Sequence, residues 1–202
     1  MTMNNILNEL KKLYPNPKCM LDYNKDYELV ISVMLSCQST DKTVNKIAKD
    51  LYKYDLKEIK NMDIKKLESI IKPVGTQHKK ASNIKVISNK LIEKGHVPND
   101  RIFLESLPGI GRKCANVILS ELYNENLIAV DTHVARTSKR LGIANDNDTP
   151  LEIERKLINS FPIEEHKLLH LRLVLFGRNI CKAKNPLCNE CPFYPCSFKK
   201  VD

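Results

Sequence analysis

Four cysteines lie close together near the C-terminal end of the chain and have the spacing of metal ligands. Cys181, Cys188, Cys191 and Cys196 read C-x6-C-x2-C-x4-C. Four thiolates within one loop suit either a single tetrahedral metal ion or a cubane iron–sulfur cluster. Zinc sites usually pair two C-x2-C knuckles, whereas this loop has only one, and spacing alone leaves both metals open.

A second stretch, SLPGIGRKCANVILSEL at residues 106–122, places cationic side chains where a helix is expected to begin. Arg112 and Lys113 come directly before an apolar helical run, although the positive end of the helix dipole disfavours cations there. An anion would favour this arrangement, because the backbone N–H groups at a helix start already attract one. The pattern therefore indicates an anion site at this helix start.

The turn before that helix has the residues needed for close backbone contact with DNA. In Pro108-Gly109-Ile110-Gly111, we expect both glycines to adopt positive φ and to expose their N–H groups to a phosphate. Ile110 would fill the space between the two flanking helices. Such contacts bind the DNA backbone regardless of base sequence. The alternative is a simple connection between two helices.

The elements that must position these residues are predicted to be helices. In TVNKIAKDLYK, residues 43–53, apolar side chains recur at i, i+3, i+4, i+7 and i+8. Similar stripes follow at residues 64–71, 84–91, 117–122 and 153–161. Strand patterns are short and weak, as at residues 127–130, so the predicted fold class is all-α with many short helices.

The charge of the chain favours a polyanionic partner. Its 33 lysines and arginines exceed its 24 aspartates and glutamates, which gives a formal net charge of +9. Residues 72–95 carry six lysines and one acidic residue, and residues 178–200 carry five basic residues and one acidic residue. Two basic segments suit a protein that grips nucleic acid on both sides. Lysine-rich solvated helix faces are the alternative.

Targeting features are not evident in the sequence. No apolar stretch is long enough to cross a membrane, and the N-terminal residues MTMNNILNELKKLY have no signal-peptide core. We therefore expect a cytoplasmic protein, nucleoid-associated if the source is bacterial or archaeal, with no membrane partner. In that compartment its seven cysteines would be thiols or metal ligands. Cys37 and Cys114 lie on apolar helical stretches and are expected to be small buried residues.

Several motifs, in this order along nearly the whole chain, resemble those of the endonuclease III family of helix-hairpin-helix DNA glycosylases. They are ISVMLSCQSTDKTVN at 31–45, LPGIGRKCANVIL in the hairpin, AVDTHVAR at 129–136, and the cysteine loop that begins GRNIC. Several motifs in the right order are far more specific than any one of them.

The resemblance implies a fold and a domain organisation. The fold would be all-α, with two lobes and a C-terminal iron–sulfur cluster loop. Residues 20–130 would form a continuous helical domain with the helix-hairpin-helix at about 101–122. Residues 1–19 and 131–202 would form the cluster domain.

The resemblance also implies the catalytic residues. The lysine after GIGR is the family's nucleophile and the aspartate of VDTH is its partner, which implies Lys113 and Asp131. A neutral lysine amine can attack C1′ of the sugar, displace the damaged base and leave a Schiff base, and Arg112 and the helix start would favour that neutral amine. Asp131 would stabilise the positive sugar and move protons during strand cleavage, and it could also cap the next helix. The two side chains are expected to meet between the lobes.

Contacts with DNA are implied on both sides of the damaged nucleotide. Gln38 in SCQST would fill the gap left by the flipped base. In KPVGTQHKK, Thr76 and Gln77 stand where the family has an apolar wedge, so lesion sensing is expected to differ. The expected DNA-contacting residues are Gln38, Thr76, Gln77, Lys79, Gly109, Ile110, Gly111, Arg112, Lys182 and Lys184.

For the cysteine loop, the resemblance favours a [4Fe-4S] cluster over zinc. The family pattern ends in C-x5-C, and this chain is one residue shorter there, which affects the shape of the loop more than its ligands. The cluster would be structural and would hold the loop that carries Lys182 and Lys184.

The predicted function is that of a bifunctional DNA glycosylase and AP lyase. The enzyme would act as a monomer in base excision repair, removing oxidised pyrimidines from duplex DNA and cleaving at abasic sites. One alternative is a monofunctional adenine-type glycosylase, which Lys113 argues against. Another is a non-enzymatic helix-hairpin-helix module that only binds DNA, and a third is a zinc-stabilised helical interaction protein.

Overall fold

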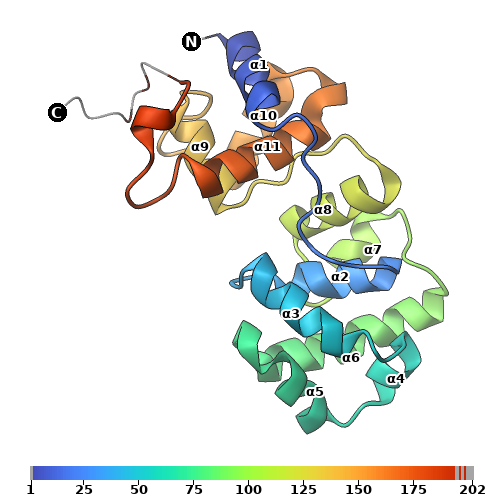
Figure 1. The fold of residues 1–202 in the computed structure, drawn as a ribbon. Helices are drawn as coiled ribbons and strands as arrows, with labels where there is room; N and C mark the ends of the chain where they lie inside the picture. Colours follow the sequence, from blue (N-terminus) through green and yellow to red (C-terminus); the bar gives the residue numbers. More distant parts are fainter. Residues whose placement is uncertain (1, 194–195, 197, 199–202) are drawn as a thin grey trace. The chain divides into compact units, whose positions relative to one another are not determined.

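The structure, a computed structural model, describes residues 2–193, 196 and 198, and all of its regular elements within these residues are helical. The α-helices are α1 (Met3–Leu13), α2 (Asp26–Leu35), α3 (Asp41–Leu51), α4 (Leu56–Asn61), α5 (Ile64–Ile71), α6 (Gln77–Lys94), α7 (Arg101–Glu105), α8 (Arg112–Tyr123), α9 (Thr132–Arg140), α10 (Pro150–Ser160) and α11 (His166–Asn179) (Figure 1). Short 3-10 helices lie at Lys72–Val74, Ile163–Glu165 and Cys188–Glu190. The all-α prediction is confirmed.

The chain forms two compact units. One unit contains Cys19–Tyr123, and the other combines Met1–Lys18 with Asn124–Asp202. The second unit is therefore built from both ends of the chain. From the sequence we expected one domain at residues 20–130 and another made of residues 1–19 and 131–202. This division stays a prediction.

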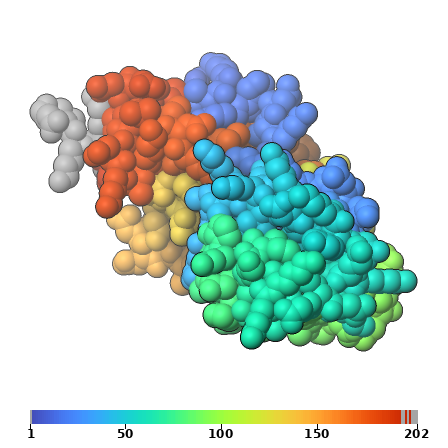
Figure 2. All heavy atoms as spheres, turned by 60° about the horizontal axis from the view of Figure 1, so that its bottom comes forward, coloured from blue at the N-terminus to red at the C-terminus, as the bar shows by residue number. Residues whose placement is uncertain are grey.

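In the Cys19–Tyr123 unit, α2 is the central buried helix. Its run from Leu29 to Leu35 is at most 1% exposed at every position, which is why this segment is apolar without a polar face. The Glu28 carboxylate accepts the backbone N–H of Asn24 at 2.7 Å and so caps the start of the helix. Helices α3, α6 and α8 pack against α2. In the space-filling view of Figure 2, side chains of α3 to α6, cyan to green, meet in a continuous surface.

The other unit holds the N-terminal helix by a buried ionic contact. Arg172 on α11 is 3% exposed. Its guanidinium donates to the Tyr14 carbonyl and to the Glu165 carboxylate, both at 3.1 Å. Lys11 of α1 forms an ion pair with the same carboxylate. Because the carboxylate lies between two cations, the end of α1 is fixed to α11.

A glycine allows close packing of α9 and α11 in this unit. A Cβ at Gly177 would lie 3.0 Å from His133 Cβ and 3.2 Å from Thr137 Cγ2. The Arg136 guanidinium donates to the Gly177 carbonyl at 2.7 Å and to His133 Nδ1 at 3.2 Å. Burial, followed by the charges of Arg136 and Arg178, lowers the pKa of His133. This histidine therefore packs between α9 and α11, where burial favours its neutral form.

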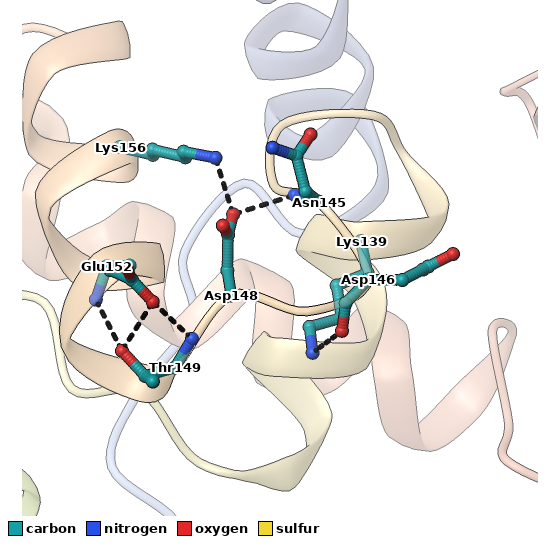
Figure 3. Close-up of polar contacts among 7 residues, drawn as sticks. All are labelled: Lys139, Asn145, Asp146, Asp148, Thr149, Glu152 and Lys156. Carbon is teal, nitrogen blue, oxygen red and sulfur yellow. Dashed lines mark hydrogen bonds and ion pairs between the residues drawn. The ribbon is translucent and has the colours of Figure 1, made fainter.

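The connection between α9 and α10 is closed by its own polar groups (Figure 3). The Asp148 carboxylate accepts the Lys156 ammonium at 2.6 Å and the Asn145 N–H at 2.7 Å. Thr149 and Glu152 form a capping box at the start of α10. The hydrogen bond from Lys156, followed by that from Asn145, lowers the pKa of Asp148.

Among the described residues, no helix is both long and apolar enough to span a membrane.

Candidate active site

The hairpin predicted at residues 101–122 is formed by α7, the turn at 108–111 and α8. Leu104, Leu107 and Ile110 are 0%, 1% and 3% exposed, so these three side chains lie inside the unit, whereas Ile102 of α7 is 83% exposed. The Ile110 N–H donates to the Leu107 carbonyl at 3.1 Å and closes the turn. The Ile110 side chain therefore anchors the hairpin and is not exposed to another molecule.

The two glycines of the turn differ, which corrects the sequence-based expectation. Gly109 has φ of +82°, and a Cβ there would lie 2.8 Å from Asn83 Nδ2 and 3.1 Å from Met34 Cγ. Gly111 is not among the residues with positive φ, and a Cβ there would meet no atom within 4 Å. Only Gly109 is required by conformation and by packing. Space at Gly111 lets another molecule approach the start of α8 closely.

Lys113 is the second residue of α8, so the helix begins with two cations as predicted. Arg112 is exposed, whereas Lys113 is half-buried. The Lys113 ammonium is close enough to Cys37, at the end of α2, to lower the pKa of that thiol. Cys37 Sγ lies 3.6 Å from Cys114 Sγ, so the start of α8 that carries Lys113 is next to the turn that carries Gln38.

Gln38 and Thr76 share an uncommon backbone conformation. Their φ values are +61° and +46°, in the left-handed region that L-residues rarely adopt, and both side chains are exposed. Such strain persists only where the surroundings hold it, and it is found preferentially at functional sites. Gln77, the first residue of α6, is half-buried, and Lys79 is exposed. The expected wedge segment is thus presented to solvent.

A buried ammonium holds these two turns together. Lys80 is 6% exposed, and its Nζ donates to the carbonyls of Leu35 at 3.0 Å, Cys37 at 2.9 Å and Val74 at 3.0 Å. All three of its N–H donors therefore have an acceptor. Burial lowers the pKa of Lys80, and the nearby Cys37 opposes that shift. Its ammonium is therefore not available for a phosphate contact.

Asp131 is the N-cap of α9, in the other unit. Its carboxylate accepts the Val134 N–H at 2.8 Å, and its backbone is extended. The residue is half-buried, and the segment before it, Ile128 to Val130, is buried without forming a strand. The capping role considered for Asp131 is confirmed, and the cap bond fixes the orientation of the carboxylate.

The four-cysteine loop follows α11 and is anchored at both ends. Near its start, Arg140 donates to Cys181 Sγ at 3.4 Å and to the Lys182 carbonyl at 2.8 Å. Near its end, Phe193 is 2% exposed and packs edge-to-face on Phe176 with ring centroids 5.1 Å apart. Lys182 is half-buried and Lys184 is exposed, so the loop presents positive charge outward.

The donor set of this loop fits a metal cluster by its chemistry. All four cysteines are free thiols and half-buried. Burial raises the pKa of the Cys191 thiol. Within the described part of the chain, the four cysteines are not gathered into a group of three or more ligands for one ion. Thiols without disulfides, with an arginine donating to sulfur, suit thiolate ligation.

Comparison with known proteins places this geometry in a family. Residues 31–162 match the HhH-GPD superfamily of base excision DNA repair proteins. The chain is 43% identical to endonuclease III of Bacillus subtilis (strain 168) over 190 residues, which cover 92% of this chain and 87% of that protein.

Two solved structures of endonuclease III with DNA are also similar. One is a trapped covalent intermediate in an estranged-adenine complex, with a TM-score of 0.93 and 40% identity over 98% of this chain and 96% of that one. The other is a non-covalent complex, with a TM-score of 0.91 and 41% identity over 96% of this chain and 94% of that one. The chain belongs to the HhH-GPD superfamily and, within it, to the endonuclease III family. The fold and the enzyme class expected from the motifs are confirmed.

The two glycines of the hairpin provide a matched test of the turn. Gly109→Ala should lower the free energy of unfolding by about 1–3 kcal/mol, because the new Cβ meets Asn83 and Met34 at positive φ. Gly111→Ala should leave it unchanged within about 0.5 kcal/mol, since its Cβ has open space. Urea denaturation followed by circular dichroism measures both. Equal losses in the two variants would contradict this account of the turn.

We expect Lys80 to contribute more to the free energy of unfolding than an exposed lysine does. Lys80→Met leaves three buried carbonyls without a donor and should lower the free energy of unfolding by about 2–4 kcal/mol. Lys79→Met, at the exposed neighbouring position, is the control and should change it by less than about 0.5 kcal/mol. Urea denaturation midpoints check the pair. A loss below about 1 kcal/mol for Lys80→Met would show that the three bonds contribute little.

Proposed function

We propose that this chain excises oxidised pyrimidines from duplex DNA with Lys113 as the nucleophile and cleaves the resulting abasic strand by β-elimination. The endonuclease III family to which it belongs supplies the reaction class, a DNA glycosylase with AP lyase activity. The finer assignment, from substrate to residue roles, rests on the positions of the side chains described above. That the protein is a monomer and that it is located in the cytoplasm both stay predictions.

The observation that carries the proposal is the position of Lys113 on the hairpin. It lies in the first turn of α8, half-buried and two residues after Gly111, around which there is open space. Phosphate oxygens bound at this helix start would place the sugar of the same nucleotide next to the amine. The neutral form of the lysine amine is the nucleophile in this reaction.

The proposed reaction proceeds through an intermediate in which the sugar is covalently bound to Lys113. The Lys113 amine attacks C1′, the bond from C1′ to the base breaks, and the base departs with a proton. The nitrogen loses a proton and the sugar ring opens, which leaves a Schiff base between Nζ and C1′. A proton is then taken from C2′, the 3′ C–O bond breaks, and the strand is cut. Water hydrolyses the Schiff base and regenerates the lysine.

Asp131 supplies the negative charge that this reaction needs. Its carboxylate would stabilise positive charge on the sugar as the base leaves and would accept protons during the elimination. The cap bond to Val134 N–H uses part of the acceptor capacity of the carboxylate and leaves the rest for the substrate.

DNA binding is assigned to exposed groups of both units. Gln38 would occupy the space of the flipped nucleotide, with Thr76 and Gln77 as a polar second wedge. The backbone of Gly109, Ile110 and Gly111, together with Arg112, would bind phosphate on one side of the lesion. Additional phosphate contacts are assigned to Lys79, Lys182 and Lys184, in keeping with the basic composition of the chain.

A [4Fe-4S] cluster is assigned to Cys181, Cys188, Cys191 and Cys196. Its contribution would be structural, because ligation by four thiolates cross-links a loop that has few apolar residues of its own. Arg140 would offset the negative charge at Cys181 through its N–H···S bond. The loop would then hold Lys182 and Lys184 where a phosphate can reach them.

Trapping with borohydride tests the nucleophile. Wild type incubated with duplex DNA that carries thymine glycol should form a covalent complex on reduction, and Lys113→Gln should form none while still binding the duplex. Lys66→Gln, an exposed lysine of the same unit outside the hairpin, should trap like wild type. Asp131→Asn keeps a good helix cap, so it should retain stability while the trapping rate falls about 10²-fold or more.

The outcomes of this experiment separate the alternatives. No trapping by wild type, with base release intact, would indicate a monofunctional glycosylase. DNA binding without base release or trapping would indicate a module that only binds DNA. Trapping by Lys113→Gln at the wild-type rate would assign the nucleophile to another amine.

Analysis of bound metal tests the cysteine loop. Protein purified without oxygen should be brown and contain about four iron atoms and four sulfides per chain, and Cys188→Ser should lose most of both. Cys19→Ser, outside the loop, is the matched control and should retain them. A colourless protein with one zinc ion per chain would show that the loop binds zinc and not an iron–sulfur cluster.

A further inference from the structure

Two cysteines outside the C-terminal loop lie in contact with each other. Cys37 Sγ is 3.6 Å from Cys114 Sγ, although the residues are 77 positions apart in the chain. Cys37 is half-buried just beyond the end of α2, and Cys114 is buried in the first turn of α8. A disulfide has its sulfurs about 2.05 Å apart. The two sulfurs would therefore have to approach each other by about 1.5 Å to form the bond.

The surroundings make the two thiols chemically different. The pKa of Cys37 is lowered to about 6 because Cys114 donates to its sulfur, and the ammonium groups of Lys113 and Lys80 add to this shift against the effect of burial. The same bond, followed by burial, raises the pKa of Cys114. One sulfur is thus a thiolate at neutral pH and its neighbour is a thiol. Oxidant-sensing cysteines show this combination of an attacking thiolate and a resolving thiol.

We propose that Cys37 and Cys114 are a peroxide-reactive dithiol whose disulfide switches off base excision by this enzyme. The Cys37 thiolate attacks one oxygen of hydrogen peroxide, the O–O bond breaks, and the products are a sulfenic acid and hydroxide, which takes up a proton. The Cys114 sulfur then attacks the sulfenic sulfur, the S–O bond breaks, and water leaves with the thiol proton. Two thiols are oxidised by two electrons in total, and one peroxide becomes two water molecules.

The position of the pair connects its redox state to the proposed catalytic groups. Gln38 directly follows Cys37, and Lys113 directly precedes Cys114. Drawing the sulfurs together would displace the strained Gln38 turn or the start of α8, and a displacement of about 1 Å in a catalytic group can reduce a rate 10²-fold. This effect on activity rests on the proposed function, whereas the disulfide itself does not.

The test treats the cluster-loaded protein with hydrogen peroxide and reads two quantities separately. Peptide mass spectrometry should find Cys37 and Cys114 linked, with a loss of two hydrogens. Borohydride trapping on thymine glycol duplex should fall at least tenfold and recover with dithiothreitol. Cys37→Ala and Cys114→Ala should fold, trap before treatment, and keep their trapping after it. Cys19→Ala, the matched thiol of the same unit, should respond like wild type.

Each outcome decides one part of the proposal. Absence of the linked peptide after peroxide treatment would overturn the dithiol whatever happens to activity. A linked peptide with unchanged trapping would overturn the switch. An equal loss of trapping in Cys37→Ala would assign the loss to damage elsewhere, such as the cysteine loop, and would also overturn the switch. If untreated wild type does not trap, the proposed function fails with the switch, while mass spectrometry still decides the disulfide.

Discussion

The ammonium of Lys80 is the interaction on which the arrangement of the turns at Gln38 and Thr76 depends. Helix α2 ends with carbonyl groups that have no partner inside the helix, and a buried helix end without such partners is unstable. Lys80 binds two of the carbonyls at this end, those of Leu35 and Cys37, and adds that of Val74 from the turn before α6. One cation thus satisfies the helix end and holds the strained residues Gln38 and Thr76 at fixed positions. A cation is also favoured at a helix C-terminus by the dipole.

Packing of the hairpin against α2 adds a second constraint to the same region. Gly109 lies against Met34 near the end of α2 and against Asn83 on α6. Three segments distant in sequence are thereby brought to one place, namely the end of α2, the turn before α6 and the start of α8. The sulfur contact between Cys37 and Cys114 is a consequence of this convergence. Binding to DNA by backbone groups needs such rigidity, because a mobile turn would lose entropy on binding.

The helices and the hairpin could be predicted from the sequence because they depend on local patterns. Apolar periodicity and the Gly-Ile-Gly turn identify α3, α8 and the hairpin, and the order of the motifs identifies the family. The role of Lys80 was missed, although it falls on the stripe of α6 at i, i+4, i+7 and i+11 with Ile84, Ile87 and Leu91. A lysine on an apolar stripe signals a buried ammonium, but its acceptors belong to other helices and cannot be found from spacing. Gly111 was misjudged for a similar reason, since φ depends on the fold around it.

The two cations at the start of α8 require a partner in the free protein as well as in a DNA complex. The helix dipole disfavours Arg112 and Lys113 at this end, and no acidic residue lies in the first turn. The Lys113 ammonium lowers the pKa of the Cys37 thiol, so a Cys37 thiolate in turn offsets part of the positive charge of Lys113. A DNA phosphate would take over this role on binding. Because Cys37 contacts Cys114, which directly follows Lys113, the proposed switch acts at the helix start where the proposed function places the substrate.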